Sequence, residues 1–303
     1  MMQGLAAFAM SARWRAIVVA TLSAAGAWLL PPLTSPLVYL GGAVVGLVTL
    51  RHGALHGLGV VAAGGAALAA FGMMSSGFAL PMLVGAWVLW LPVWALGLLL
   101  RSTRSLVLSL QVAAALGVIV LGLAYFWLGQ PTAWWAPRLE EMLGPVFTAQ
   151  GLDVGSYLPQ LARWMTALSV AALIFGALLS LLLARAWQAG LYNPGGFGVE
   201  FRALRLGRSF AVLSLATAAT ATVLSGSLGQ FMADALVTLL VIYLLQGLAL
   251  VHAIVHSMQA HRGWLIGLYT VLLLATPEMM PLLALLGWMD TWIDFRARVG
   301  RSA

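Results

Sequence analysis

Two pairs of histidines share a spacing that could do chemistry. His52 and His56 are four residues apart, and so are His252 and His256. Residues four apart lie on one face of a helix, so each pair could offer two imidazoles to a metal ion or a proton path. No carboxylate accompanies either pair at ligand spacing. The alternative is that these histidines pack or lie at a membrane interface, and we predict no metal and no cofactor.

Three other polar residues interrupt apolar stretches, namely Gln111, Gln246 and Glu278. Polar groups inside a membrane are costly and are often functional. Glu278 lies between prolines in residues 276–281, and a carboxylate beside an interrupted helix is typical of transporter sites. The alternative is that Glu278 faces water. Together with His252, these three residues are the predicted ligand-binding residues.

No constellation of catalytic residues is found in the sequence. The absence of cysteine excludes disulfides and thiolate catalysis. Serine and histidine never form a nucleophile elbow, no HExxH occurs, and no two carboxylates frame a site. We therefore predict that the protein is not an enzyme.

The residues around these polar positions are strongly apolar. The chain is 62% hydrophobic and 8% charged, whereas soluble domains have about 25% charged residues. Residues 52–100 contain no charged residue, which is enough for two membrane-spanning helices. We predict an all-α bundle of eight or nine transmembrane helices in one integral membrane domain, residues 1–303. The predicted spans are residues 16–30, 36–50, 53–72, 78–100, 105–128, 161–184, 209–226, 231–257 and 263–288.

Arginine accounts for all fifteen basic residues, and the formal net charge is +7. The arginines lie at the ends of apolar segments and in alternate loops, which fits membrane orientation and not nucleic-acid binding. The rule that cytoplasmic loops are positive predicts a cytoplasmic N-terminus, a cytoplasmic loop at 185–208 and an extracytoplasmic loop at 129–160. We expect a multi-pass protein of the bacterial inner membrane, with the lipid bilayer as a partner and no nucleic acid.

The C-terminal end does not follow this rule if there are nine spans. Arg296, Arg298 and Arg301 would then lie outside the cell, which is disfavoured. A break at residues 276–281 would instead make the last segment a re-entrant pair of short helices. Both interpretations remain open from the sequence.

Small residues recur every four positions in the first two predicted spans. Such faces allow helix backbones to approach closely in lipid. They either pack inside this chain or dock another membrane subunit. The predicted helix-packing residues are Ala12, Ala16, Ala20, Ala24, Gly42 and Gly46.

The loop at residues 191–208 begins with a tight turn, Asn193-Pro194-Gly195-Gly196. After the turn, aromatic and leucine side chains fall on one helical face and arginines on another, which is typical of a helix at the inner leaflet. The alternative is a docking site for a cytosolic protein. The residues predicted to contact lipid or a partner are Asn193, Phe197, Phe201, Arg202, Arg205 and Arg208.

Three strings of the sequence resemble the YybS-like family of uncharacterised bacterial multi-pass membrane proteins. They are residues 192–208, residues 246–252 and residues 287–296. The resemblance covers most of the chain and is at the level of motifs only in the C-terminal half. The family is loosely similar to the substrate-binding membrane subunits of energy-coupling-factor transporters, which dock through small residues of their first helix. The resemblance is compatible with such a role for Ala12–Ala24.

Two functional hypotheses follow. The first is a transporter component that binds a small molecule inside its helix bundle. It has no nucleotide-binding motif, so its energy would come from a partner protein or an ion gradient. The second is a membrane scaffold that recruits a cytosolic protein through the 191–208 loop.

Overall fold

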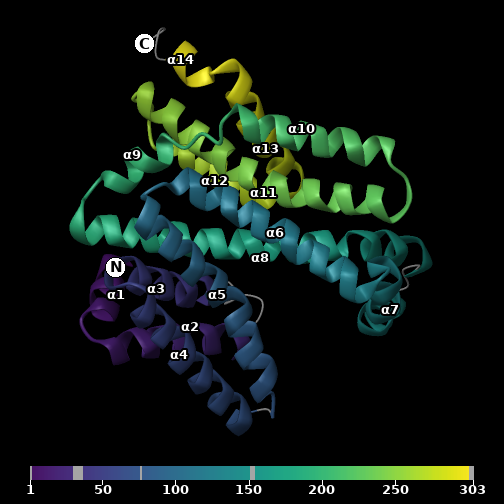
Figure 1. Cartoon of the computed structure of the whole chain (residues 1–303), viewed down its shortest axis with the longest axis horizontal. Coiled ribbons are helices and arrows are strands. Elements are labelled where there is room, and N and C mark those ends of the chain that lie inside the picture. Colours follow the sequence, from purple (N-terminus) through teal and green to yellow (C-terminus); the bar gives the residue numbers. More distant parts are fainter. Residues whose placement is uncertain (1, 30–36, 76, 151–153, 300–303) are drawn as a thin grey trace. The chain divides into compact units, whose positions relative to one another are not determined.

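The computed structural model describes residues 2–29, 37–75, 77–150 and 154–299, and these residues form fourteen α-helices and no strand (Figure 1). The prediction of an all-α fold is therefore confirmed. The helices divide between two compact units. Unit 1 comprises residues 1–113 and 175–204, and unit 2 comprises residues 114–174 and 205–303.

Six helices belong to unit 1: α1 (Met2–Met10), α2 (Arg13–Leu29), α3 (Leu37–His52), α4 (Ala54–Ser75), α5 (Ala79–Thr103) and α9 (Gly196–Arg202). Another six belong to unit 2: α7 (Pro131–Ala149), α10 (Arg208–Val223), α11 (Gly226–Ser257), α12 (Gly263–Leu274), α13 (Thr276–Ile293) and α14 (Phe295–Val299). Two helices contribute residues to both units: α6 (Leu106–Leu128) and α8 (Val154–Tyr192).

Five of these helices are long and apolar enough to cross a membrane. They are α4, α5, α6, α8 and α11. The helices α3, α10 and α12 are apolar but shorter. A helix satisfies its own backbone hydrogen bonds, which is the reason that apolar segments of this length fold as helices in lipid.

Unit 1 is held together by small residues at the helix crossings. Helix α2 packs against α3 and α4, and the alanines at positions 16, 20 and 24 are all buried. A Cβ atom added to Gly42 would lie 2.9 Å from the Cβ of Ser180, and one added to Gly46 would lie 2.9 Å from the Cβ of Ala184. Three of the predicted alanines and both predicted glycines are therefore used for packing within this unit. Ala12 lies in the short connection between α1 and α2 and is half-buried.

Helix α11 is the centre of unit 2 and packs against α10, α12, α13 and α14. Helices α10 and α11 lie side by side and are joined by a connection of two residues (Figure 1). Helices α11 and α13 cross at Gly247 and Gly287, where a Cβ on either glycine would overlap the backbone of the other helix. This crossing sets the position of the C-terminal part of the unit.

Three predicted segments differ from the structure. The predicted span 263–288 is two helices, because α12 ends at Leu274 and α13 begins at Thr276 with a proline in its first turn. The predicted loop 129–160 contains α7 and the first residues of α8, which pack together through Leu139 and Leu158. The helix expected between the Asn193 turn and residue 208 is shorter than predicted and consists of α9 alone.

Helix α9 ends at Arg202, so the arginines at 205 and 208 do not continue its polar face. The chain is not helical at residues 204–207. Gly207 has a positive φ of +84°, a backbone conformation that glycine adopts readily. The backbone N–H of Leu206 bonds to the side chain of Gln246 on α11.

Candidate functional site

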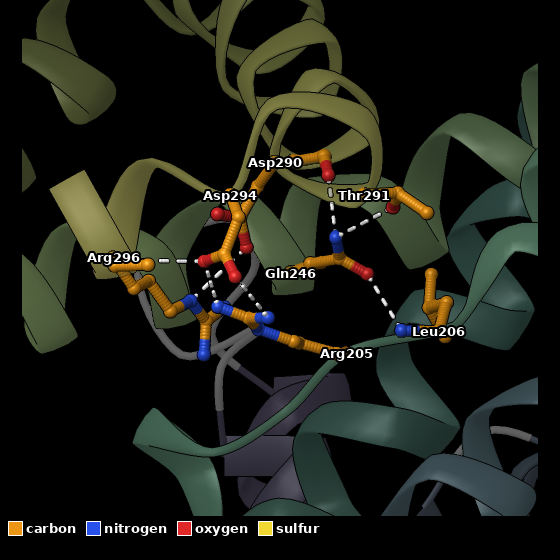
Figure 2. A network of polar contacts seen from close by, with 9 residues as sticks. Arg205, Leu206, Gln246, Asp290, Thr291, Asp294 and Arg296 are labelled. Carbon is orange, nitrogen blue, oxygen red and sulfur yellow. Dashed lines mark hydrogen bonds and ion pairs between the residues drawn. The ribbon is translucent and has the colours of Figure 1, made fainter.

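A fully buried amide, Gln246 of α11, joins three segments of unit 2. Its Oε1 accepts a hydrogen bond of 2.8 Å from the backbone N–H of Leu206. Its Nε2 donates to the carbonyl of Gly287 and to Oγ1 of Thr291 at 3.1 Å, both on α13. Figure 2 shows Gln246 between Leu206 on one side and α13 on the other. An amide has two donor hydrogens, and both are used here. The side chain of Gln246, a predicted ligand residue, therefore connects α11 with α13 and with the segment that precedes α10.

Two ion pairs lie beside this amide. Nε of Arg296 is 3.0 Å from Oδ2 of Asp290, and this aspartate side chain is completely buried. The other Asp290 oxygen, Oδ1, is buried and has no hydrogen-bond partner among the described residues. The guanidinium of Arg205 bonds to both carboxylate oxygens of Asp294, which follows α13 (Figure 2).

These contacts bring the three strings that carry the family resemblance into one network. Leu206, Gln246 and Gly287 come from one string each. The Arg205–Asp294 pair also places Arg296 beside the predicted cytoplasmic loop. If residues 263–288 form a re-entrant pair of helices, the chain after them returns to the side of the membrane on which residue 263 lies. Arg296 is then expected on the same side as the predicted cytoplasmic loop.

Asp294 lies outside the candidate membrane spans, and its charge is stabilised by its partners. The hydrogen bonds from Arg205, with a smaller effect from the backbone N–H of Ala297, lower the pKa of Asp294 below its ordinary value. The same bond raises the pKa of Arg205. A lowered carboxylate pKa stabilises the fold above the unfolded-state pKa, and this stabilisation is lost as the pH falls through the folded-state pKa.

We therefore expect Asp294→Asn to lower the thermal unfolding midpoint at pH 7 and to have no effect in acid. The decrease should be about 2 °C or less, because both side chains are more than 40% exposed. Asparagine also tolerates the left-handed conformation of this residue (φ +49°), so the substitution isolates the charge. The measurement is thermal unfolding between pH 7 and pH 2, with the exposed Glu141→Gln as the control. A difference that persists below pH 3 would contradict the assignment.

A second buried carboxylate, Asp234, lies in α11. It accepts hydrogen bonds of 2.8 Å from the Tyr125 hydroxyl and of 2.8 Å from Nε2 of Gln230. Nε of Arg163 donates to Oε1 of Gln230 at 2.9 Å. Asp234 falls within the predicted span 231–257, and its exposure is 1%. An ionisable group among membrane helices is a functional candidate that the sequence reasoning missed.

The side chains of His52 and His56 lie close together, but the two residues belong to different helices. Gly53 has φ +91° and separates α3 from α4, so His52 ends one helix and His56 lies in the first turn of the next. Their ring centres are 5.6 Å apart. A guanidinium nitrogen of Arg13, at the start of α2, is 2.6 Å from Nε2 of His56. Arginine can only donate, so Nε2 of His56 is the acceptor.

These three side chains line a pocket of about 560 Å³ within unit 1, which we call the histidine pocket. Its other walls come from α1 to α4 and are mainly alanine, glycine and aliphatic residues. The complete lining is Ala9, Met10, Ala12, Arg13, Ala16, Ile17, Val48, His52, Leu55, His56, Gly59 and Val60. Two members of the predicted alanine face, Ala12 and Ala16, therefore form part of its wall.

The second histidine pair has different surroundings. His252 contacts the carbonyl of Leu248 at 2.9 Å and the hydroxyl of Tyr269 at 3.4 Å, whereas His256 is exposed. Within the described ranges, no three His, Asp or Glu side chains gather as metal ligands. Of the remaining predicted ligand residues, Gln111 is half-buried on α6 and Glu278 is exposed in the first turn of α13.

The loop residues predicted to contact lipid or a partner are partly used within the fold. Asn193 is exposed in the turn, and the rings of Phe197 and Phe201 are stacked with centres 5.7 Å apart. Arg202 is half-buried at the end of α9, and Arg208 is exposed at the start of α10.

The helices and their composition define the chain as a multi-pass α-helical membrane protein. Comparisons with protein-family models, curated proteins and solved structures give no match. The resemblance to the YybS-like family therefore stays a prediction.

Proposed function

We propose that the protein is a small-molecule-binding component of a transport system in the bacterial cytoplasmic membrane, and that the small molecule binds in the histidine pocket. The observation that carries this proposal is the pocket itself. Its volume of about 560 Å³ is within the range of small-molecule sites, about 300–1,000 Å³. Such sites combine apolar walls with a few convergent polar groups, as this one does.

The polar groups of the pocket select the charge of the ligand. Arg13 is always positively charged, and a neutral imidazole of His52 or His56 has one ring nitrogen that donates a hydrogen bond. The remaining walls are apolar. The best ligand is therefore a molecule with an apolar body and one negatively charged group, which would contact Arg13 and the two histidines. A carboxylate or a phosphate has this chemistry.

The transport part of the proposal rests on the class of protein and on the motifs of the sequence. Five long apolar helices support a multi-pass protein. The sequence contains no nucleotide-binding motif, so the binding subunit would depend on a partner protein or an ion gradient.

Native mass spectrometry of gently purified protein tests this function. We expect a retained small molecule, and we expect Arg13→Gln to reduce its occupancy about tenfold because a charge-assisted hydrogen bond is lost. Arg262→Gln, a change at an exposed arginine outside the pocket lining, is the control and should keep the ligand. Repeated purification without any retained molecule, or equal occupancy in both variants, would overturn the proposal.

The membrane scaffold is a second candidate, and one observation favours it. Val199 of α9 is 63% exposed beside the exposed Asn193 turn. Cross-linking from Asn193 that captures one cytosolic protein, together with the absence of a ligand in native mass spectrometry, would favour the scaffold.

A further inference from the structure

Four arginines converge on one pocket of unit 1 that is separate from the histidine pocket. Arg51 lies in the last turn of α3, Arg101 lies in the last turn of α5, and Arg104 directly follows α5. Arg185 reaches the same place from α8. The pocket has a volume of about 420 Å³, and its other lining residues are Leu50, Leu100 and Gln188. We call it the arginine pocket.

Arg185 is held by hydrogen bonds to two other side chains of the unit. Its Nε is 2.7 Å from Oε2 of Glu200 on α9, and a second guanidinium nitrogen, Nη1, donates to Oε1 of Gln188 at 2.7 Å. Its side chain is 27% exposed. Glu200 is therefore the one carboxylate that forms an ion pair in this group within the described residues.

Neutral groups hold two of the other arginines. Arg101 donates to the backbone carbonyl of Leu50 at 2.8 Å. The guanidinium carbon of Arg51 lies 4.3 Å from the ring centre of Tyr192. Over the described ranges, neither of them nor Arg104 forms an ion pair. All three side chains are exposed, so a ligand can reach them.

Within the described residues, Glu200 is the one carboxylate paired with these four arginines, so the arrangement leaves a net positive charge. The carbonyl ends of α3 and α5 offset only part of it, because a helix end carries about half a charge. Membrane orientation explains the presence of arginines at this end of the helices. It does not require that arginines from three helices converge on one cavity.

A phosphate group fits this chemistry better than other anions. The planar guanidinium forms two parallel hydrogen bonds to a phosphate, and several arginines can share its oxygens. We propose that the arginine pocket binds a phosphate group, carried by the headgroup of an anionic phospholipid or by a soluble phosphorylated molecule. This inference is independent of the function proposed for the histidine pocket.

The test measures binding of three probes to purified full-length protein in detergent. The probes are phosphatidylglycerol, phosphatidylcholine and inorganic phosphate, the last compared with chloride at the same ionic strength. Native mass spectrometry and the thermal unfolding midpoint report binding. We expect Arg104→Gln to weaken binding of the favoured probe about tenfold, and Arg51→Gln with Arg104→Gln to abolish it. Arg262→Gln, an exposed arginine before α12, is the matched control and should bind normally.

The probes separate the two sources of phosphate. Selective binding of phosphatidylglycerol supports a lipid headgroup, and stabilisation by inorganic phosphate supports a soluble ligand. Equal responses of Arg104→Gln and Arg262→Gln to every probe would overturn the proposal. If the double variant fails to fold, Arg104→Lys decides: it keeps the charge but loses the planar fork, so the proposal requires weaker binding by about threefold or more.

Discussion

Replacing Gly287 with alanine is expected to destabilise the protein by at least about 3 kcal/mol or to prevent its folding, because the new methyl group has no space. The added Cβ would lie 2.6 Å from the backbone nitrogen of Gly247 and would also overlap the carbonyl oxygen of Tyr243. Both atoms belong to the backbone of α11, which cannot rotate away as a side chain can. Helices α11 and α13 would have to separate.

A glycine in a neighbouring helix provides the matched control. A Cβ at Gly267 of α12 would have no atom within 4 Å. Gly267→Ala should therefore be neutral or stabilise the helix by up to about 1 kcal/mol. Thermal unfolding of the two purified variants in the same detergent measures the difference. Equal midpoints would show that the helices do not cross closely at Gly287.

The positions of the helices could be predicted from the sequence to a large extent, because apolar length is a local property. Runs without charge, such as residues 52–100, correspond to α4 and α5. The break in the last segment also has a local cause, since Pro277 lies in the first turn of α13. Which helices pack against one another is not determined by such a local feature of the sequence. The alanines of α2 look alike whether they face α3, a ligand or another subunit.

The candidate sites were harder to predict because their contacts join distant residues. Tyr125 and Asp234 are 109 positions apart, and no pattern in the sequence links them. Asp290 and Arg296 are close in sequence but resemble the charged end of a chain, so their burial was not foreseen. The two histidines at 52 and 56 were expected to share a helix, and the left-handed Gly53 between them makes this wrong.

Replacing Asp290 with asparagine is expected to cost about 3 kcal/mol, because it leaves the charge of Arg296 without its buried partner. The side chain of Arg296 is 12% exposed and that of Asp290 is fully buried. Removal of one member of a buried ion pair typically costs about 3–5 kcal/mol. We place the effect at the lower end because Asp294 also attracts Arg296.

A double substitution separates the charge from the packing. If the loss comes from separating Arg296 from the carboxylate of Asp290, Asp290→Leu together with Arg296→Met should recover most of the stability, since an apolar pair needs no ion-pair partner. Arg296→Met alone should be destabilising, because it leaves the carboxylate of Asp290 buried, with one oxygen that already has no hydrogen-bond partner. Thermal unfolding of Asp290→Leu alone closes the double-mutant cycle, which gives the coupling between the two residues. Additive effects would mean that the two residues stabilise the end of α13 independently, through their separate contacts.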